Sequence, residues 1–472
     1  MQRRTVVFLW LTIVTGLVSA QDAAPAVTPI PATLGQEAPF PYRWKFPAPS
    51  PEELASRRAA LAAAVGNGVA ITVSAPPPEL SSGSRYKPDH DSWYFTGVDS
   101  DPCVWVMTAK DGKIDSEKLF LPTFNKSYEL WNGRRWCAGP ESAAATGIPE
   151  SKIVALSGGN FGGANSMKPV EDHLRALMTS NPAVWYVEGA EGRAEGGGLS
   201  IDTPDRGGMV KKFLRSIAPE KTKIRGLGGL SGKLRSVKSP YEIELIRRAA
   251  WITGEGFHDA MRHARPGMWE FEFQGFMERA FTSRGATGVP YYPIAASGPN
   301  ACVLHYTDSR RQMQDGDVVL CDIAAEYGYY AADITRSFPV NGKFTPRQKQ
   351  VYEAVLAGPE AAAAALKPGA SLMSLDAACR DAMIAAGLKS AELHPHGLGH
   401  HVGLDVHDPG AMVFTPGMVI TIEPGAYIRK ESLGIRIEDL YLVTETGAEC
   451  LSKMIPKTVA EIEALVGSAW RK

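Results

Sequence analysis

The order of apolar and polar residues divides the chain into regions with different periodicities. From about residue 51 to residue 230, amphipathic helical stretches alternate with short apolar runs such as VAITV and CVWVM. Runs of this length between helical stretches are typical of strands in an open sheet. The pattern therefore predicts an α/β domain over residues 51–230.

A glycine-rich run, GLGGLSG at residues 226–232, stands at the end of this region. It resembles a phosphate-binding loop, but Ser231 occupies the position of the third required glycine. We also do not expect it at a strand-to-helix turn of a βαβ unit. We interpret the run as the linker to a second domain, over residues 231–472.

Two helix starts mark the second domain. The sequence SPYE, residues 239–242, has an N-cap serine, a proline at the first helical position and a glutamate that closes a capping box. TPRQ, residues 345–348, repeats the arrangement before a helix that we expect Pro359 and Pro368 to interrupt. The segment between the two starts must be mostly strand.

That segment, DVVLCDIAAEYGYYAADITRSF, is apolar and β-rich on both sides of Tyr327-Gly328. With a hairpin tip at this dipeptide, Asp322 and Asp333 are equidistant from the tip. Residues placed symmetrically in an antiparallel hairpin lie opposite each other on one face, about 5 Å apart at Cβ. We therefore expect two carboxylates to face each other within apolar strands.

The same symmetry recurs downstream. GMVITIEPGAYI and GIRIEDLYLV flank a polar loop centred on Lys430-Glu431, which makes Glu423 and Glu438 cross-strand neighbours. Like charges in such positions destabilise a hairpin and are costly to desolvate. A single pair could be a solvent-exposed edge. Two pairs in one domain predict a bound cation.

Histidines are concentrated in HPHGLGHHVGLDVHD, residues 394–408, which holds five of the ten in the chain. Carboxylates with a single imidazole suit Mn²⁺, Co²⁺, Fe²⁺ or Zn²⁺, and four carboxylates can bridge two ions. A structural zinc site would use cysteine and histidine instead. Two such ions favour a hydroxide that attacks a carbonyl, so hydrolysis is the predicted reaction class.

Charge and composition limit the kinds of partner that we expect for this protein. The chain has 472 residues, 44% hydrophobic and 21% charged, with 50 basic and 51 acidic residues and a net charge of −1. Without long like-charge runs, we expect neither nucleic acid nor a membrane surface as a partner. Of the six cysteines, Cys302, Cys321 and Cys379 lie in apolar contexts, which favours free thiols. Cys103 with Cys137 is the one pair that could form a disulfide.

The N-terminus has the features of a secretory signal peptide. Arg3 and Arg4 precede an apolar run that ends in Val18-Ser19-Ala20, a small-residue cleavage pattern. We expect residues 1–20 to be removed, residues 21–50 to form a disordered Pro/Ala-rich leader, and the protein to be exported, periplasmic or secreted. No membrane attachment is expected after cleavage.

Five residues, in chain order, resemble the metal ligands of the M24 family of Xaa-Pro aminopeptidase (aminopeptidase P) and prolidase: Asp322, Asp333, His400, Glu423 and Glu438. The resemblance covers residues 237–466, and DSWYFTGV (91–98) and YELWNGRRW (128–136) are similar to the N-terminal domain of aminopeptidase P. It implies an α+β pita-bread catalytic domain with pseudo-twofold symmetry. It also implies a ribonuclease-H-like α/β N-terminal domain that restricts access to the site, and a dimer or tetramer.

The resemblance also implies roles for these residues. Asp322 would bind one divalent ion, most commonly Mn²⁺ but also Co²⁺ or Zn²⁺. Asp333 and Glu438 would bridge two ions, and His400 and Glu423 would complete the second. Glu423 would be the general base for a metal-bridging hydroxide. His305, His396 and His407 would contact substrate, steady the tetrahedral intermediate and pass a proton to the leaving prolyl nitrogen. Arg436 would orient ligands or a substrate carboxylate. Tyr291 and Asp91 are further candidates for substrate binding, Asp91 at the free α-amine.

Two histidines, His394 and His401, have no such role, and we expect them to be structural or exposed. The predicted function is hydrolysis of the bond between an N-terminal residue and a following proline in peptide substrates. Two alternatives stay open. One is prolidase, which has the same ligands and cleaves Xaa-Pro dipeptides. The other is a non-catalytic peptide-binding protein of the same fold.

Overall fold

The computed structural model describes residues 48–75, 86–157, 167–179, 184–187 and 206–471. The predicted signal peptide and most of the predicted leader lie outside these residues. None of the helices in the described part of the chain combines the length and the hydropathy needed to span a bilayer.

The described N-terminal domain contains a six-stranded mixed sheet in the order β4-β3-β2-β1-β5-β6. Strands β1, β2 and β3 are antiparallel neighbours, whereas β5 and β6 continue from β1 in parallel. The strands are β1 (Gly68–Val73), β2 (Val104–Lys110), β3 (Lys113–Pro122), β4 (Ile153–Leu156), β5 (Val184–Val187) and β6 (Lys223–Gly226). The helices are α1 (Pro51–Val65), α2 (His90–Thr96), α3 (Lys126–Asn132), α4 (Pro140–Thr146), α5 (Lys168–Thr179), α6 (Arg206–Ile217) and α7 (Gly228–Ser236).

Both faces of this sheet are buried, which explains the apolar runs VAITV and CVWVM. Alternate residues of a strand point to opposite faces. Ala70 and Trp105 accordingly pack with Leu61 of α1, whereas Val69 and Ile71 belong to a separate apolar cluster with residues of α5 and α6. The α/β domain predicted from these runs has this layered arrangement.

The glycine-rich run at residues 226–232 differs from the sequence-based expectation. It connects the last residue of β6 directly to the first turn of α7, so it does lie at a strand-to-helix turn. The following element is α8 of the second domain rather than another strand of the same sheet. The connection between the domains is therefore a helix, α7.

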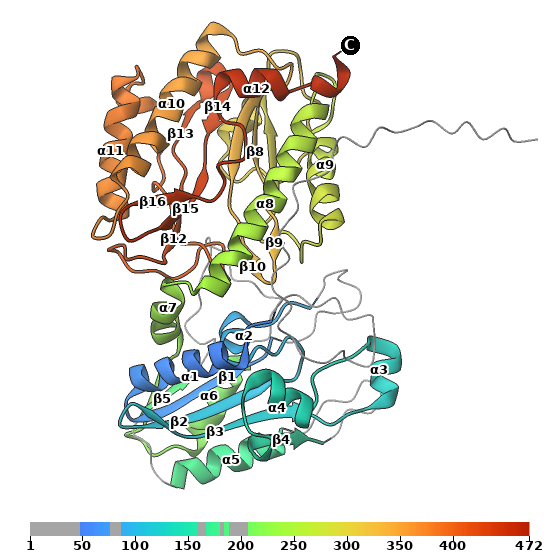
Figure 1. The fold of residues 1–472 in the computed structure, drawn as a ribbon, viewed down its shortest axis with the longest axis vertical. Helices are drawn as coiled ribbons and strands as arrows, with labels where there is room; N and C mark the ends of the chain where they lie inside the picture. Colours follow the sequence, from blue (N-terminus) through green and yellow to red (C-terminus); the bar gives the residue numbers. More distant parts are fainter. Residues whose placement is uncertain (1–47, 76–85, 158–166, 180–183, 188–205, 472) are drawn as a thin grey trace, which may run out of the picture. The chain divides into compact units, whose positions relative to one another are not determined.

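The C-terminal domain has two halves with the same order of elements: two packed helices, then short strands interrupted by a two-stranded hairpin. Figure 1 shows the two helix pairs on either side of the strands. The first half contains α8 (Pro240–His263), α9 (Glu270–Ser283), β7 (Ile294–Ser297), β8 (Val318–Asp322), β9 (Glu326–Tyr327), β10 (Tyr330–Ala331) and β11 (Thr335–Pro339). The second contains α10 (Pro346–Ala365), α11 (Leu372–Ala385), β12 (Val419–Ile422), β13 (Gly425–Ile428), β14 (Leu433–Arg436), β15 (Asp439–Val443) and β16 (Ala448–Cys450), followed by α12 (Val459–Leu465).

Both predicted capping boxes are present, at the N-caps Ser239 of α8 and Thr345 of α10. The expected interruption at Pro359 is wrong, because α10 continues through it to Ala365. A proline inside a helix removes one backbone hydrogen bond. Here Pro359 is buried, and packing of α10 against α11 outweighs that loss. The helix ends before Pro368, as predicted.

All six cysteines lie in the described part of the chain and are free thiols. Cys103 is buried and Cys137 partly buried, and they form no disulfide with each other. Burial raises the pKa of Cys103 to about 12, so this thiol is protonated and unreactive near neutral pH.

Candidate metal centre

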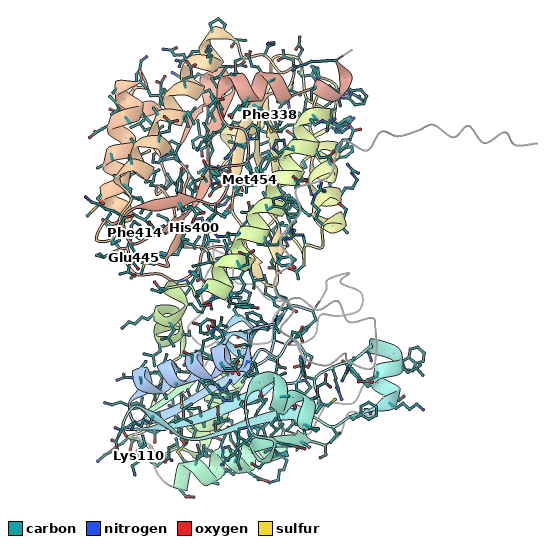
Figure 2. The ribbon with its side chains drawn as sticks, in the orientation of Figure 1. Lys110, Phe338, His400, Phe414, Glu445 and Met454 are labelled. Atoms are coloured by element: carbon teal, nitrogen blue, oxygen red, sulfur yellow. The ribbon has the colours of Figure 1, made fainter. Side chains whose placement is uncertain are left out.

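The five residues predicted to bind metal come from places where the strand ladders stop. Asp322 is the last residue of β8, and Asp333 lies between β10 and β11. Glu423 lies between β12 and β13, and Glu438 between β14 and β15. His400 precedes β12, and its carbonyl accepts a hydrogen bond from the backbone N–H of Thr421 (2.8 Å) in that strand. Figure 2 marks His400 in this part of the domain.

The symmetry predicted for the second pair of carboxylates is confirmed. Ladders β12–β15 and β13–β14 have one continuous register, which places Glu423 opposite Glu438. The polar loop centred on Lys430-Glu431 is the connection between β13 and β14. A period of two residues was enough to find this pair.

The predicted pairing of Asp322 with Asp333 is wrong by two residues, since Asp322 pairs with Thr335. The reason is the turn. Gly328 and Tyr329 both have positive φ, 57° and 71°, so the hairpin tip lies one residue later than expected. Asp333 nevertheless reaches the same place: it stands between β10 and β11, and its ligand atom lies within 4.8 Å of that of Asp322.

Ligand atoms of these side chains converge in three overlapping groups, each with its atoms within 4.8 Å of one another. One group joins Asp322 and Asp333 to Glu438, and another joins His400 and Glu423 to Glu438. A third brings His407 to Asp333 and His400. All five predicted ligands therefore belong to one cluster.

The electrostatics show what this cluster requires. Burial raises the pKa of Glu423 to about 7, that of Asp322 above its usual value and that of Glu438 well above it. Burial by itself would lower the pKa of His400. The hydrogen bond to Asp333 and the negative charge of that carboxylate outweigh burial and raise the pKa of His400 to about 9. Carboxylates this close hold protons unless a cation neutralises them. The oxygen-rich donor set with one imidazole fits divalent ions such as Mn²⁺, Co²⁺ or Zn²⁺.

Other side chains hold the carboxylates in place. Asp322 accepts a hydrogen bond from the Tyr291 hydroxyl (2.6 Å) and another from Arg436 Nη2 (2.6 Å). The Thr335 hydroxyl donates to Glu438 (2.7 Å). The Arg436 guanidinium is buried, and Tyr427 and Thr335 accept from its other nitrogens. Arg436 thus orients a predicted metal ligand, one of the two roles expected for it, and Tyr291, expected at the substrate, bonds to the same carboxylate.

Two further histidines, His396 and His407, adjoin the cluster. The His396 ring lies 3.0 Å from the Tyr427 hydroxyl and 4.0 Å from Glu423. Burial lowers its pKa to about 4, so it is neutral near pH 7. The His407 ring lies 4.0 Å from the His400 ring, measured between centroids. His305 is exposed on the segment after β7.

The two histidines without an expected role are buried and structural. His394 pairs with Asp376 (3.0 Å), and His401 bonds to the carbonyl of Ala411 (3.0 Å). Burial lowers the pKa of both rings, to about 4 for His401. The histidine-rich stretch therefore divides between the cluster and the core.

Asp91 is the one candidate that the structure places elsewhere. One carboxylate oxygen accepts from Arg235 (2.8 Å) and the other from the Ser231 hydroxyl (2.7 Å), and the side chain is buried. Both oxygens thus have partners inside the protein. This argues against binding to a substrate amine.

Sequence reasoning missed two side chains of the site, Thr335 and Tyr427. Each lies an even number of residues from a carboxylate, two after Asp333 and four after Glu423. In an extended strand such residues share a face. The same period that found the carboxylates could have found these partners.

Comparison with known proteins agrees with this geometry. The profile of metallopeptidase family M24 matches residues 244–445, and that of the aminopeptidase P N-terminal domain matches residues 54–152. The Xaa-Pro aminopeptidase of Escherichia coli is 32% identical over 453 residues, which cover 89% of this chain and 98% of that protein. The chain belongs to metallopeptidase family M24. Human Xaa-Pro aminopeptidase 3 is 31% identical over 413 residues, covering 81% of this chain and 77% of its own.

Solved M24 structures extend the similarity to the fold. A variant of Escherichia coli aminopeptidase P in complex with substrate matches with a TM-score of 0.76 at 31% identity, over 90% of this chain and 99% of its own. Proline aminopeptidase P II from Yersinia pestis gives a TM-score of 0.76 at 29% identity, over 89% and 100%. The predicted pita-bread domain with an aminopeptidase P N-terminal domain is confirmed.

Proposed function

We propose that this M24 protein is a dinuclear metal-dependent exopeptidase that hydrolyses the bond between an N-terminal residue and a following proline. The observation that carries the proposal is the convergence of four carboxylates and one imidazole in a single cluster, in which Asp322, Asp333 and Glu438 are buried. Similarity to Xaa-Pro aminopeptidases along both domains supports the substrate class.

The arrangement of the groups suggests how two ions would be held. Glu438 belongs to two of the three sets of converging ligand atoms, the set with Asp322 and the set with His400. Asp333 likewise shares one set with Asp322 and another with His400. We assign Asp322 to one ion, Asp333 and Glu438 to both, and His400 and Glu423 to the other, with Mn²⁺ as the proposed metal. When bound, the ions would supply a shared hydroxide at neutral pH and polarise the scissile carbonyl.

The protein groups around the ions then have distinct tasks. Glu423 stands beside His400 in the group assigned to the second ion, and we assign it to accept the proton of the attacking water. The bond from the carbonyl carbon to the prolyl nitrogen breaks, and that nitrogen needs a proton because it carries no N–H of its own. His396 and His407 adjoin the cluster, and we assign them, together with the exposed His305, to substrate contact and to this proton transfer.

Replacement of Asp333 or Glu438 by alanine tests the assignment. Each change should abolish both metal content and hydrolysis of an Arg-Pro-Pro peptide, because the shared ligand is lost. Metal analysis by mass spectrometry and a peptidase assay measure the two outcomes. Glu431→Ala, at an exposed carboxylate in the connection between β13 and β14, is the matched control and should retain both. A D333A protein with full metal content and activity would refute the site.

A dipeptidase activity is the second candidate, because human Xaa-Pro dipeptidase is 36% identical over 296 residues, 49% of this chain and 60% of its own. The two activities differ in the length of the peptide. We expect cleavage of Arg-Pro-Pro at least as fast as that of Gly-Pro. Cleavage of Gly-Pro alone would establish the dipeptidase instead.

A further inference from the structure

A buried group of charges joins the two domains next to His407. Arg235, near the end of α7, is 3% exposed. Its Nη1 donates to Asp91 of the N-terminal domain at 2.8 Å. Its Nη2 donates to both Asp405 and Asp408 of the C-terminal domain, at 2.5 Å each. One guanidinium therefore binds carboxylates from both domains.

The two aspartates of the C-terminal domain flank Val406 and His407 and close the loop that carries them. The Asp408 N–H donates to the His401 carbonyl (2.8 Å), and the Gly403 N–H donates to the Asp405 carbonyl (3.0 Å). The Asp405 N–H donates to an Asp408 carboxylate oxygen (3.3 Å). The conformation of residues 403–408 therefore depends on where these two carboxylates are held.

Two more side chains bind the same carboxylates. Lys238 binds the second oxygen of Asp408 at 2.9 Å, and His90 Nδ1 lies 2.6 Å from Asp405. Burial alone would raise the pKa of Asp408, but Arg235 and Lys238 hold it below its usual value. Both side chains of the Asp408–Lys238 pair are nearly inaccessible to solvent. The loop is thus held by desolvated, charge-assisted hydrogen bonds, the stronger kind.

His407 depends on this loop for its position. Its ring lies 4.0 Å from that of His400, yet no hydrogen bond to another described residue holds the ring itself. The side chain is exposed. The backbone of residues 403–408 therefore decides where the imidazole lies relative to the metal cluster.

We propose that Arg235 is a positioning residue that fixes His407 over the cluster and makes hydrolysis depend on the N-terminal domain through Asp91. The inference rests on the proposed function, in which His407 contacts the substrate. A planar guanidinium can bind on two sides at once, whereas a lysine ammonium is a single point charge. Arg235→Lys therefore keeps the charge and loses the bridge.

Hydrogen exchange of the full chain tests the anchoring without an assay of activity. In R235K and in Asp91→Asn, the amides of residues 403–408 should exchange at least about tenfold faster than in the parent protein. Arg58→Lys is the matched control: Arg58 is also buried and paired with a carboxylate, Glu117 at 3.2 Å, but lies wholly within the N-terminal domain. Unchanged exchange in both R235K and D91N would overturn the proposal.

A kinetic double-mutant cycle tests the connection to His407. R235K and D91N should lower kcat roughly 10- to 100-fold with a change in KM below about threefold, because a small displacement of a catalytic group has effects of this size. Metal content should be unchanged. In a His407→Ala background, the same two changes should have almost no further effect on kcat, since the group that they position is absent.

The outcomes separate the inference from the proposed function. Full activity of H407A would overturn both the role of His407 and its positioning by Arg235. Low activity of H407A, with equal losses from D91N in both backgrounds, would overturn the positioning alone. Absence of Xaa-Pro cleavage in the parent protein would refute the proposed function, while the exchange experiment would still report on the anchoring.

Discussion

Individual ionisable residues at the metal centre bind protons more tightly than the same residues in an unfolded chain. Burial raises the pKa of Glu423 from 4.5 to about 7, and the charge of Asp333 outweighs burial to raise that of His400 from 6.5 to about 9. Divalent ions compete for the same atoms, so metal binding should release protons. The cluster is a place where metal, protons and folding are coupled.

This coupling predicts the pH dependence of the metal-free protein. Burial lowers the pKa of several histidines, including His396 and His401, so below about pH 6.5 these rings bind fewer protons in the folded state and oppose the shift of Glu423. Above about pH 7 the raised pKa of His400 remains, so the folded state binds more protons and its stability should fall as the pH rises to about 9. The shift of His400 from 6.5 to about 9 corresponds to a loss on the order of 3 kcal/mol. Thermal unfolding after treatment with a chelator, at about pH 7 and pH 9, measures it.

Added Mn²⁺ provides the control for that experiment. It should restore the thermal midpoint at the higher pH, where the ligands are most easily deprotonated, and have less effect at the lower pH. A metal-free protein that is more stable at about pH 9 than at pH 7 would contradict the coupling.

Secondary-structure elements position the ligands mainly by their ends. The strands that carry the carboxylates are short, and the carboxylates stand where one ladder stops and the next begins. His400 is positioned differently, by a segment that lies against β12. That segment can approach the strand only because residue 399 is glycine: a Cβ there would lie 2.2 Å from the Thr421 carbonyl oxygen.

Gly399→Ala should therefore displace the segment that carries His400. The clash is with backbone, which cannot rotate away, so we expect a loss of at least about 3 kcal/mol and weaker metal binding. Urea unfolding and metal titration measure the two effects. Gly397→Ala is the matched control, because a Cβ at residue 397 meets nothing within 4 Å. Equal stability of the two variants would contradict the explanation.

The whole molecule behaves as two domains with a shared core. Apolar residues of α1 and α2 belong to the same buried cluster as those of α8 and of the β9–β10 hairpin. Trp93 of α2 is 4% exposed and contacts the rings of Tyr329 and Tyr330 edge-on, at 5.5 and 5.9 Å between centroids. The contact joins the N-terminal domain to the hairpin between the metal ligands Asp322 and Asp333.

Trp93→Ala should destabilise the whole protein rather than one domain. Removal of a buried tryptophan costs about 3–5 kcal/mol. Probes in both domains should report one unfolding transition at a lower denaturant concentration. Trp131→Ala, at a tryptophan that is 68% exposed, should change stability by less than about 0.5 kcal/mol. Separate transitions for the two domains would contradict a shared core.

Export is a prediction for the whole chain that depends on residues 1–20. We predict cleavage after Ala20, which would leave Gln21 as the first residue of the mature protein. The mass and N-terminal sequence of protein recovered outside the cytoplasm test it. Recovery of the intact chain with Met1 from the cytoplasm alone would refute the prediction.

Local features of the sequence were enough to determine several parts of this protein. The capping boxes at Ser239 and Thr345 depend on residues three apart. The pairing of Glu423 with Glu438 depends on their equal distance from the centre of one loop. Such signals survive in the sequence because neighbouring residues alone produce them. The five predicted ligands could be identified for the same reason, since each lies in a recognisable short motif.

The tertiary structure alone decided the features that depend on contacts between distant segments. Because the hairpin tip lies at Gly328-Tyr329, Asp322 pairs with Thr335 and not with Asp333. The backbone conformation of the turn sets this register. Arg235 bound Asp91, which no local pattern indicates. His407 reached His400 through a loop held by charges from both domains. These outcomes arise from packing and desolvation between segments far apart in the chain, which spacing along the sequence does not encode.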